Sequence, residues 1–381
     1  MNTKISGRIL LFIFLSTASI GCRKDTQVAP EELINTLFPA EPNASVRGLY
    51  LVNEGNMSMN KASLDYVDFT TGSYRRNIYN QANPQVTKGL GDVGNDVGVY
   101  GSKLYVVVNG SNKVEVLNVK TGKRIQQIDI INCRYITFSK GKAYVSAYLG
   151  QIGDQKAPNG IVAEIDTTLL KETKRIEVGR QPEEMVVVGD NLYIANSGGY
   201  TPGNYENTIS IINLTTFKET KRIPVAINLH RLKADRYGDL YVTSRGDYLN
   251  IPSKLYVIST QTDQIKKVFD VAAGNIVIDD DLAYLYSSAF NIVTGESIVS
   301  YDMINVKDEI LISRKFITDG TDKLIKIPYG LAVHPTTKDV FVTDATDHIT
   351  PGVLYCFDST GKKKWSVETG DIPAQFAFVY K

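Results

Sequence analysis

Few residues in this 381-residue chain have types and spacing that suit catalysis. Its three histidines, His230, His334 and His348, fall in three different repeat units of the sequence, and none stands beside an obvious nucleophile. The sequence contains neither the G-x-S-x-G turn of serine hydrolases nor the H-E-x-x-H pair that binds zinc on a helix. We therefore predict no catalytic residue, no metal ligand and no covalently attached cofactor.

A larger group of polar and aromatic residues suits the binding of a ligand. Tyrosine is abundant, with 22 copies against one tryptophan, and its ring offers a flat contact surface with a polar tip. The candidate ligand-binding residues are Asn95, Asp96, Arg134, Tyr148, Glu183, Glu184, Asn196, Tyr200, Tyr205, His230, Arg231, Arg245, Asp247, Tyr248 and Tyr329. Flat rings among scattered polar groups favour a broad, rigid and partly apolar ligand. The alternative is that several of these side chains pack loops against each other.

Two groups within this set have a second interpretation. The pair His230-Arg231 is either a ligand contact or a capped pair in the core. The carboxylates of Asp96, Glu183 and Glu184 are of the type that surrounds a central metal ion in lactonase-like enzymes. Together with His230 they leave an enzyme of that kind as an alternative.

These residues must be positioned by a strand pattern that repeats from residue 47 onward. The repeats share a short apolar strand with a central aromatic residue: Leu49–Leu51, Leu104–Val106, Ala143–Val145, Leu192–Ile194, Leu240–Val242, Ala283–Leu285 and Val340–Val342. Their spacing of roughly 40 to 57 residues is typical of propeller blades. Each repeat continues with an alternating strand, a tight polar turn, a charged strand and a further apolar strand. We predict an all-β, seven-bladed β-propeller with four-stranded blades over residues 47–381.

The two ends of this domain are expected to meet in one blade. We name the strands of a blade A to D from the axis outward, so that each repeat runs in the order B, C, D, A. The domain begins on a B strand near Gly48 and ends on an A strand, Pro373–Val379. The C-terminal strand should therefore complete the first blade, which closes the ring without an open sheet edge.

The connections at the two ends of the blades differ in length. The A–B turns and most C–D turns are short and rich in Gly, Asp and Asn. The longer B–C loops are Asn53–Ala62, Leu149–Asn159, Ser197–Glu206, Ser244–Pro252 and Thr343–Pro351. They share one face with the D–A loops, and long loops on a rigid scaffold commonly carry binding residues. We predict that this face binds the ligand.

The N-terminus has the pattern of a bacterial export signal. Lys4 and Arg8 precede the apolar run Ile9–Leu15, which is too short to span a bilayer. Residues 19–22 read Ser-Ile-Gly-Cys and resemble a lipobox, which implies a signal peptide over residues 1–21 and a lipid anchor on Cys22. The alternative is a plain secretory signal in which this cysteine occurs by chance.

The segment after the cysteine is polar and contains several prolines. We predict a flexible tether over residues 22–46, with one or two helical turns at Glu31–Leu37. Arg23-Lys24-Asp25 resembles the surface-export signal of Bacteroidetes lipoproteins and favours the outer face of the outer membrane over the periplasm.

Composition argues against two further features. The 42 basic residues are balanced by 41 acidic ones, so no charge excess indicates a nucleic-acid partner. Cys133 and Cys356 fall in different predicted blades, and we expect two buried free thiols rather than a disulfide.

Several stretches resemble known propellers. Leu192–Asn196 and Leu240–Thr243 resemble the Tyr-Val-Thr-Asn signature of the YncE-like family. Gln181–Met185, Asn228–Leu232 and Ser244–Tyr248 resemble a narrower group, the BtuG-type surface lipoproteins of Bacteroidetes. That resemblance implies that the chain captures cobalamin or another corrinoid as its bound ligand. It also implies transfer of the ligand to a BtuB-type TonB-dependent transporter in the outer membrane.

Two other functions remain as alternatives on the same scaffold. The first is a surface binder of a glycan or a protein, and the second is the lactonase-like enzyme. A corrinoid carries its cobalt already held by the ring, so its capture needs no metal ligand from the protein.

Overall fold

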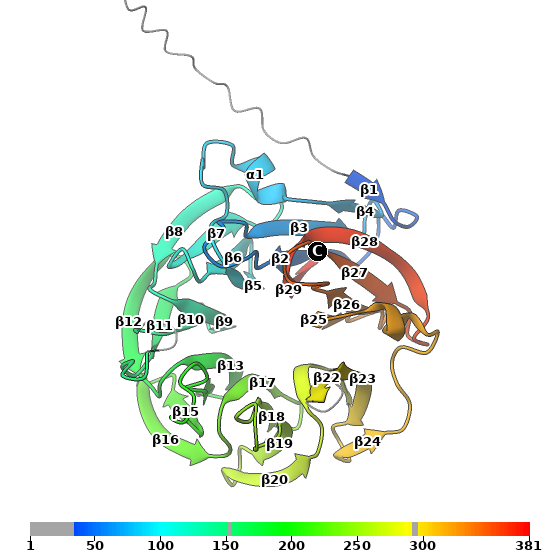
Figure 1. The fold of residues 1–381 in the computed structure, drawn as a ribbon. Coiled ribbons are helices and arrows are strands. Elements are labelled where there is room, and N and C mark those ends of the chain that lie inside the picture. Colours follow the sequence, from blue (N-terminus) through cyan, green and yellow to red (C-terminus); the bar gives the residue numbers. More distant parts are fainter. Residues whose placement is uncertain (1–33, 151–153, 292–295) are drawn as a thin grey trace, which may run out of the picture.

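The computed structural model describes residues 34–150, 154–291 and 296–381, which form seven sheets around a central axis (Figure 1). Six sheets have four strands and one has five, and neighbouring strands run antiparallel. The seven-bladed β-propeller predicted from the repeats is thereby confirmed.

The blades follow one another around the ring in chain order, with the innermost strand named first here. Blade 1 contains β29 (Pro373–Tyr380), β2 (Val46–Asn53), β3 (Ser63–Asp68), β4 (Ser73–Arg75) and β1 (Ile34–Thr36). Blade 2 contains β5 (Gly94–Tyr100), β6 (Lys103–Val108), β7 (Lys113–Asn118) and β8 (Arg124–Asp129). Blade 3 contains β9 (Cys133–Ser139), β10 (Lys142–Ala147), β11 (Ile161–Asp166) and β12 (Lys171–Glu177). Blade 4 contains β13 (Pro182–Val188), β14 (Asn191–Asn196), β15 (Thr208–Asn213) and β16 (Lys218–Pro224).

The remaining three blades have the same order of strands. Blade 5 contains β17 (Leu229–Ala234), β18 (Asp239–Ser244), β19 (Lys254–Ser259) and β20 (Gln264–Phe269). Blade 6 contains β21 (Ala273–Asp279), β22 (Leu282–Asn291), β23 (Glu296–Asn305) and β24 (Ile310–Ile312). Blade 7 contains β25 (Pro328–Val333), β26 (Val340–Asp344), β27 (Pro351–Phe357) and β28 (Lys363–Asp371).

The C-terminal strand closes the ring as predicted. β29 pairs with β2, with Leu51 opposite Phe376 and Leu49 opposite Phe378. The first blade is thus assembled from both ends of the domain, and the ring has no unpaired inner edge between its ends.

The segment before the propeller corrects one prediction. Ile34–Thr36 forms a strand on the outer edge of β4, and the N–H groups of Leu37 and Phe38 donate to the Gly72 carbonyl at 2.8 and 3.3 Å. The Phe38 ring stacks on Trp365 with centroids 5.8 Å apart. The flexible tether predicted for residues 22–46, with helical turns at 31–37, is therefore wrong over residues 34–46. An open strand edge and an apolar contact together hold this polar-looking segment in place. The predicted signal peptide and Cys22 lie outside the described residues.

The aromatic residue of each repeat joins one blade to the next. The B strands are covered by blades on both sides, so Leu104, Tyr105 and Val106 of β6 have no exposed surface. In blade 1 the Tyr50 hydroxyl donates to the Val119 carbonyl of blade 2 at 2.7 Å. In blade 5 the Tyr241 hydroxyl donates to the carbonyl after β23 in blade 6, at 3.2 Å. In these two blades the ring packs between blades while its hydroxyl reaches a partner, whereas the buried Tyr105 hydroxyl has no hydrogen-bond partner in the described ranges, so packing is the role that the repeats share.

Helices are minor elements in this chain. α1 (Ile78–Ala82) and the 3₁₀ helix η1 (Thr321–Leu324) both lie in D–A connections. No helix among residues 34–150, 154–291 and 296–381 is long and apolar enough to cross a membrane. Cys133 and Cys356 are free and buried, as predicted.

Candidate ligand-binding site

Every inner strand begins with an irregularity in its pairing. In β5, β9, β13, β17, β21, β25 and β29 the register with the neighbouring strand shifts within the first few residues. Such a β-bulge turns side chains away from the regular alternation and is common beside binding sites. The polar and aromatic residues at or next to these bulges are Asn95, Asp96, Arg134, Tyr135, Glu183, Glu184, His230, Arg231, Asn275, Tyr329 and Gln375. We call this region, around the axis on the B–C loop face, the mouth.

The backbone before the bulges is strained in five blades. The residue directly before the inner strand has a positive φ at Val93 (55°), Asn132 (47°), Gln181 (49°), Asn228 (55°) and Ile372 (55°). A left-handed conformation is unfavourable for side chains other than glycine, and most of all for branched ones. Each such residue costs about 1–3 kcal/mol, and strain of this kind tends to cluster at binding sites. The rest of the propeller therefore stabilises a particular backbone path at the mouth.

Glu183 is the centre of one wall of the mouth. Its fully buried carboxylate accepts hydrogen bonds from the Tyr148 hydroxyl at 2.7 Å and from Arg134 Nη2 at 3.1 Å. Arg245 Nη1 lies 3.3 Å away on the same carboxylate. Burial alone would raise the pKa of Glu183, but the charges of Arg134 and Arg245 outweigh it and lower that pKa. Glu183 is therefore an anion that holds two arginines from different blades.

The second acidic residue of β13 has a different role. Glu184 Oε1 pairs with Lys233 Nζ at 2.6 Å, and Oε2 accepts the N–H of Leu232 at 2.8 Å. Both partners belong to β17, so this carboxylate ties blade 4 to blade 5. Among the described residues, no group of three or more His, Cys, Asp or Glu side chains is arranged to hold a metal ion.

Arg231 and His230 occupy the bottom of the mouth. Arg231 Nη1 donates to the Tyr135 hydroxyl at 3.3 Å, and Nη1 and Nη2 donate to the Gln375 amide oxygen at 2.6 and 2.9 Å. The Tyr135 hydroxyl also lies 2.9 Å from His230 Nε2. Burial, together with the charges of Arg245 and Arg231, holds the pKa of His230 well below its usual range. The imidazole is thus neutral at neutral pH, among cations.

The opposite wall is acidic and aromatic. The Tyr329 hydroxyl donates to Glu54 Oε2 at 2.9 Å. The Tyr329 carbonyl accepts from the Tyr286 hydroxyl at 2.7 Å and from Asn275 Nδ2 at 3.1 Å. Burial raises the pKa of Glu54, although its hydrogen bond from Tyr329 and the charge of Arg134 oppose that effect. This wall therefore offers aromatic surface and a weakened acid.

Asn95 and Asp96 brace the strand next to them. Asn95 Nδ2 donates to the Arg134 carbonyl at 2.5 Å. Asp96 accepts the N–H of Ile136 and of Val97, each at 2.9 Å. Burial raises the pKa of Asp96 to about 7, against these two hydrogen bonds. Both residues lie at the mouth as predicted, but their polar atoms are engaged by the backbone.

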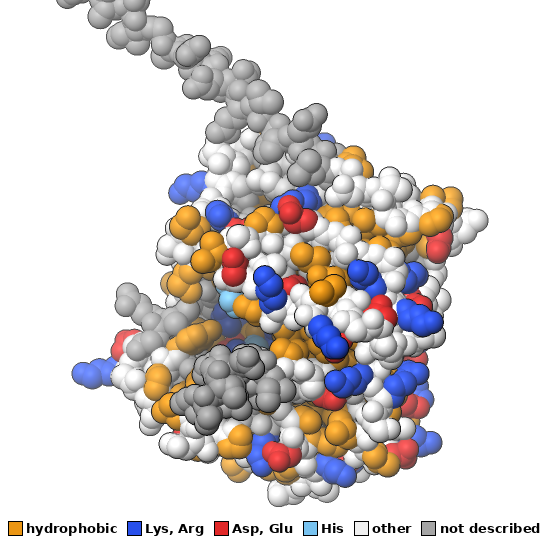
Figure 2. Space-filling model, turned by 45° about the vertical axis from the view of Figure 1, so that its right-hand side comes forward, with side chains coloured by type: hydrophobic (Ala, Val, Ile, Leu, Met, Phe, Trp, Pro, Cys, Tyr) orange, Lys and Arg blue, Asp and Glu red, His pale blue; other side chains and the backbone are white. Residues whose placement is uncertain are grey.

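The rim of the mouth is formed by tyrosines of the B–C loops. Tyr248 is 66% exposed and Tyr200 is 37% exposed. The Tyr200 ring meets Tyr148 edge-on, with centroids 6.4 Å apart, so exposed and buried rings form a continuous aromatic surface. Tyr205 is half-buried on the loop of Tyr200. In the space-filling view, a recess on this face contains histidine and basic side chains between apolar ones (Figure 2).

Two predicted residues have local structural contacts instead. Asn196 is fully buried within blade 4, where its amide donates to the hydroxyls of Thr208 at 3.1 Å and Ser210 at 2.8 Å. Asp247 accepts backbone N–H groups within its own loop, including that of Ile251 at 2.7 Å. Both therefore use hydrogen bonds to shape the loops that carry the rim, and the Asn196 Oδ1 atom is buried without a partner among the residues that the structure describes.

Five residues of the mouth are absent from the predicted site: Glu54, Tyr135, Asn275, Tyr286 and Gln375. Tyr135, Asn275 and Gln375 occupy the same place in their blades as Asp96 and Arg231, the third residue of an inner strand. That shared position is a signal in the sequence, and alignment of the seven repeats on it would have found them. Glu54 lies in the B–C loop Asn53–Ala62 of the predicted binding face, whereas Tyr286 comes from a B strand, for which the repeats give no such signal.

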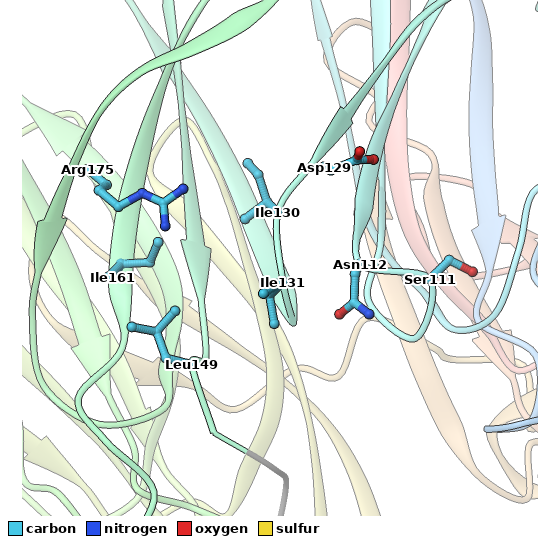
Figure 3. Close-up of a pocket in the computed structure, with 8 residues that line it drawn as sticks. All are labelled: Ser111, Asn112, Asp129, Ile130, Ile131, Leu149, Ile161 and Arg175. Atoms are coloured by element: carbon cyan, nitrogen blue, oxygen red, sulfur yellow. The ribbon is translucent and has the colours of Figure 1, made fainter.

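A second hollow lies between blades 2 and 3 on the same face (Figure 3). It has a volume of about 390 Å³ and is lined by Ser111, Asn112, Asp129, Ile130, Ile131, Leu149, Ile161 and Arg175. In the close-up, Ile161 and Leu149 lie on one side of it, and Ile130 and Ile131 lie on the other. Leu149 directly follows Tyr148, so this apolar hollow adjoins the wall of the mouth.

Comparison with known proteins identifies the fold and one family. A family model described as "Domain of unknown function (DUF5074)" matches residues 47–378. No match was found among curated proteins.

Solved structures resemble the chain over most of its length at low identity. A hypothetical selenium-binding protein from Sulfolobus tokodaii has a TM-score of 0.62 at 13% identity, over 90% of this chain and 96% of that one. A quinonprotein alcohol dehydrogenase-like protein from Bacteroides thetaiotaomicron has a TM-score of 0.61 at 16% identity, over 87% and 78%. A putative 6-phosphogluconolactonase from Bacteroides fragilis has a TM-score of 0.60 at 14% identity, over 89% and 100%. Their diverse names agree with a shared propeller fold and no shared activity.

Proposed function

The chain belongs to the DUF5074 family, whose description assigns no activity, and from that premise we propose that it is a binding protein that captures its ligand at the mouth. The observation that carries this proposal is the convergence of seven bulged inner strands on one buried network of arginines, carboxylates and tyrosines. A rigid concave site with a few oriented polar groups and an aromatic rim is typical of small-molecule binding.

The proposed ligand is cobalamin or another corrinoid. Three stretches resemble BtuG-type lipoproteins: Gln181–Met185, Asn228–Leu232 and Ser244–Tyr248. They contain Glu183, Arg231 and Arg245 of the buried network, and Tyr248 of the rim. A corrin ring is wide and amphipathic, and it matches an aromatic rim around polar groups. A glycan or a protein ligand at the same mouth is the alternative that the experiment below distinguishes.

We further propose that the protein is anchored by lipid on Cys22 at the cell surface and hands its ligand to a TonB-dependent outer-membrane transporter. The sequence resemblance supports this placement. β1, the first described strand, lies on the outer edge of blade 1 and away from the axis (Figure 1).

Calorimetric titration of the full chain, purified in detergent, with cyanocobalamin tests the proposal. We expect a dissociation constant below about 1 µM. Tyr248→Ala should weaken binding about tenfold, because Tyr248 is an exposed ring on the rim. Tyr237→Ala is the matched control, since Tyr237 is also an exposed tyrosine of blade 5 but lies in its A–B turn, on the opposite face. If cyanocobalamin does not bind with a dissociation constant below about 1 µM, the proposal of a corrinoid ligand is rejected. If Tyr248→Ala and Tyr237→Ala weaken binding equally, the mouth is rejected as the binding site.

A further inference from the structure

Arg231 is a buried cation that lacks a close carboxylate. Its side chain is 8% exposed, and the nearest acidic oxygen among the described residues is Glu184 Oε1, at 4.0 Å. That oxygen is already paired with Lys233 at 2.6 Å. The hydrogen bonds of the Arg231 guanidinium go to neutral oxygens, the Tyr135 hydroxyl and the Gln375 amide.

Other arginines of low exposure are paired in the described part of the chain. Arg134 lies 3.1 Å from Glu183, and the 14% exposed side chain of Arg180 lies 3.1 Å from Glu206. Desolvation of a charge is costly unless an opposite charge at hydrogen-bonding distance compensates for it. Arg231 therefore departs from the pattern that the rest of the molecule follows, and it does so at the bottom of the mouth.

The surroundings of Arg231 add positive charge rather than removing it. Its wall holds four cations, Arg134, Arg231, Lys233 and Arg245, whereas the carboxylates paired with them are Glu183 and Glu184. Glu54 and Asp96 are the other acids near the mouth. Burial raises the pKa of each, to about 7 for Asp96, so the negative charge of Asp96 at neutral pH is reduced.

We infer that Arg231 and Arg245, with His230 and Tyr135 beside them, form a subsite for an oxyanion, a phosphate or carboxylate group carried by the ligand. A planar guanidinium presents paired N–H donors that match the oxygens of such a group. Arg245 is 22% exposed on the rim side and extends the cationic surface toward solvent. The neutral imidazole and the phenol share one hydrogen bond between His230 Nε2 and the Tyr135 hydroxyl, so the pair retains one further hydrogen to donate. This inference deepens the proposed function and rests on it for the place where the ligand binds.

Two corrinoids provide the first arm of the test. Cobalamin carries a nucleotide loop with a phosphodiester, and cobinamide lacks both. Titrations of the full chain with cyanocobalamin and with dicyanocobinamide should differ roughly tenfold to hundredfold in affinity, in favour of cyanocobalamin. Arg231→Gln should remove this difference by weakening cyanocobalamin binding, while dicyanocobinamide binding changes by less than about twofold.

Inorganic phosphate alone provides the second arm, which is independent of any corrinoid. At constant ionic strength, with chloride as the balancing anion, phosphate should raise the melting temperature of the wild-type chain in a saturable way. Arg231→Gln should abolish that rise. Arg236→Gln is the matched control, because Arg236 lies in the A–B turn of the same blade and is 54% exposed there. It should leave both arms unchanged.

If Arg231→Gln does not fold, a second variant at the same position still tests the subsite. Arg231→Lys keeps the buried charge but loses the planar pair of donors, and it should lower cyanocobalamin affinity at least threefold. If neither corrinoid binds and phosphate still stabilises the wild type through Arg231, the corrinoid proposal fails and the oxyanion subsite stands. Equal binding of the two corrinoids, together with a phosphate effect that the Arg231 variants retain, would overturn the subsite.

Discussion

The two faces of the propeller use charged residues in opposite ways. On the A–B face, Lys140 pairs with Asp190 and Arg236 pairs with Asp281, each across neighbouring blades. The side chains of the first pair are 72% and 60% exposed. At the mouth, in contrast, Glu183 has no exposed surface and is shared between two arginines.

On the A–B face water solvates the charged groups, whereas at the mouth the charges are buried and only protein groups stabilise them. An exposed ion pair gains little free energy because water screens it, whereas a buried one is costly to break. Because the seven blades are nearly equivalent, exposed ion pairs could have joined neighbouring blades on both faces. Buried charge also occurs within blade 2, where Glu115 is shared by Lys113 and Arg124, but at the mouth it joins three blades around the axis, which supports the mouth as the proposed ligand site.

The largest expected effect is at the centre of the buried network. Glu183→Gln leaves Arg134 and Arg245 without their shared anion, and it should lower the free energy of unfolding by about 3–5 kcal/mol. Denaturant titration at neutral pH measures this. Glu172→Gln is the control, because Glu172 pairs with a largely exposed Arg175 on outer strand β12. Losses of similar size in both variants would contradict the distinction between the two kinds of charge.

A smaller and pH-dependent effect is expected at Asp96. Its pKa in the folded protein, about 7, lies above the ordinary value of 3.8, mainly because of burial. The folded state therefore holds this proton where the unfolded state has lost it, and the stability that Asp96 contributes falls as pH rises from about 4 through 7. Asp96→Asn should gain stability relative to the wild type over that range, by no more than about 1.4 kcal/mol per pH unit.

Unfolding in denaturant from pH 4 to 8 measures this slope. Asp358→Asn is the control, because the Thr360 hydroxyl lowers the pKa of Asp358 in its exposed turn. The stability that Asp358 contributes changes only below the ordinary Asp pKa of 3.8, so the difference between Asp358→Asn and the wild type should be flat from pH 4 to 8. A flat difference between Asp96→Asn and the wild type would show that Asp96 is not a buried titrating group.

The fold could be predicted from sequence because its signals are local and repeated. A strand such as Leu104–Val106 occurs seven times with an aromatic centre, and its burial follows directly from packing between two blades. The tether was misjudged because its contacts are not local. Phe38 packs on Trp365, which lies far along the chain, and no pattern within residues 34–46 predicts this contact.

The mouth could be predicted in part. Arg134, Glu183 and Arg231 were found because they stand at the starts of inner strands on the loop-rich face. Their pairing was not predicted, because it depends on bulges that redirect consecutive side chains. Asn196 was assigned to the site from its position before a loop, yet the strand alternation turns it into blade 4. Register at a bulge is a property of tertiary structure, so the sequence alone leaves it open.

The smallest change in the free energy of unfolding is expected on the A–B face, where the ion pairs are exposed. Asp190→Asn removes an exposed ion pair with Lys140 and should change the free energy of unfolding by no more than about 0.5 kcal/mol. Because water and salt screen such a pair, the change should shrink further when the salt concentration rises. Denaturant titrations at low and high salt measure both quantities. A loss well above 1 kcal/mol that persists in high salt would mean that charges between the A–B turns tie the blades together. The buried network at the mouth would then no longer be the feature that distinguishes the two faces, and the case for placing the ligand there would rest on the bulges and the aromatic rim alone.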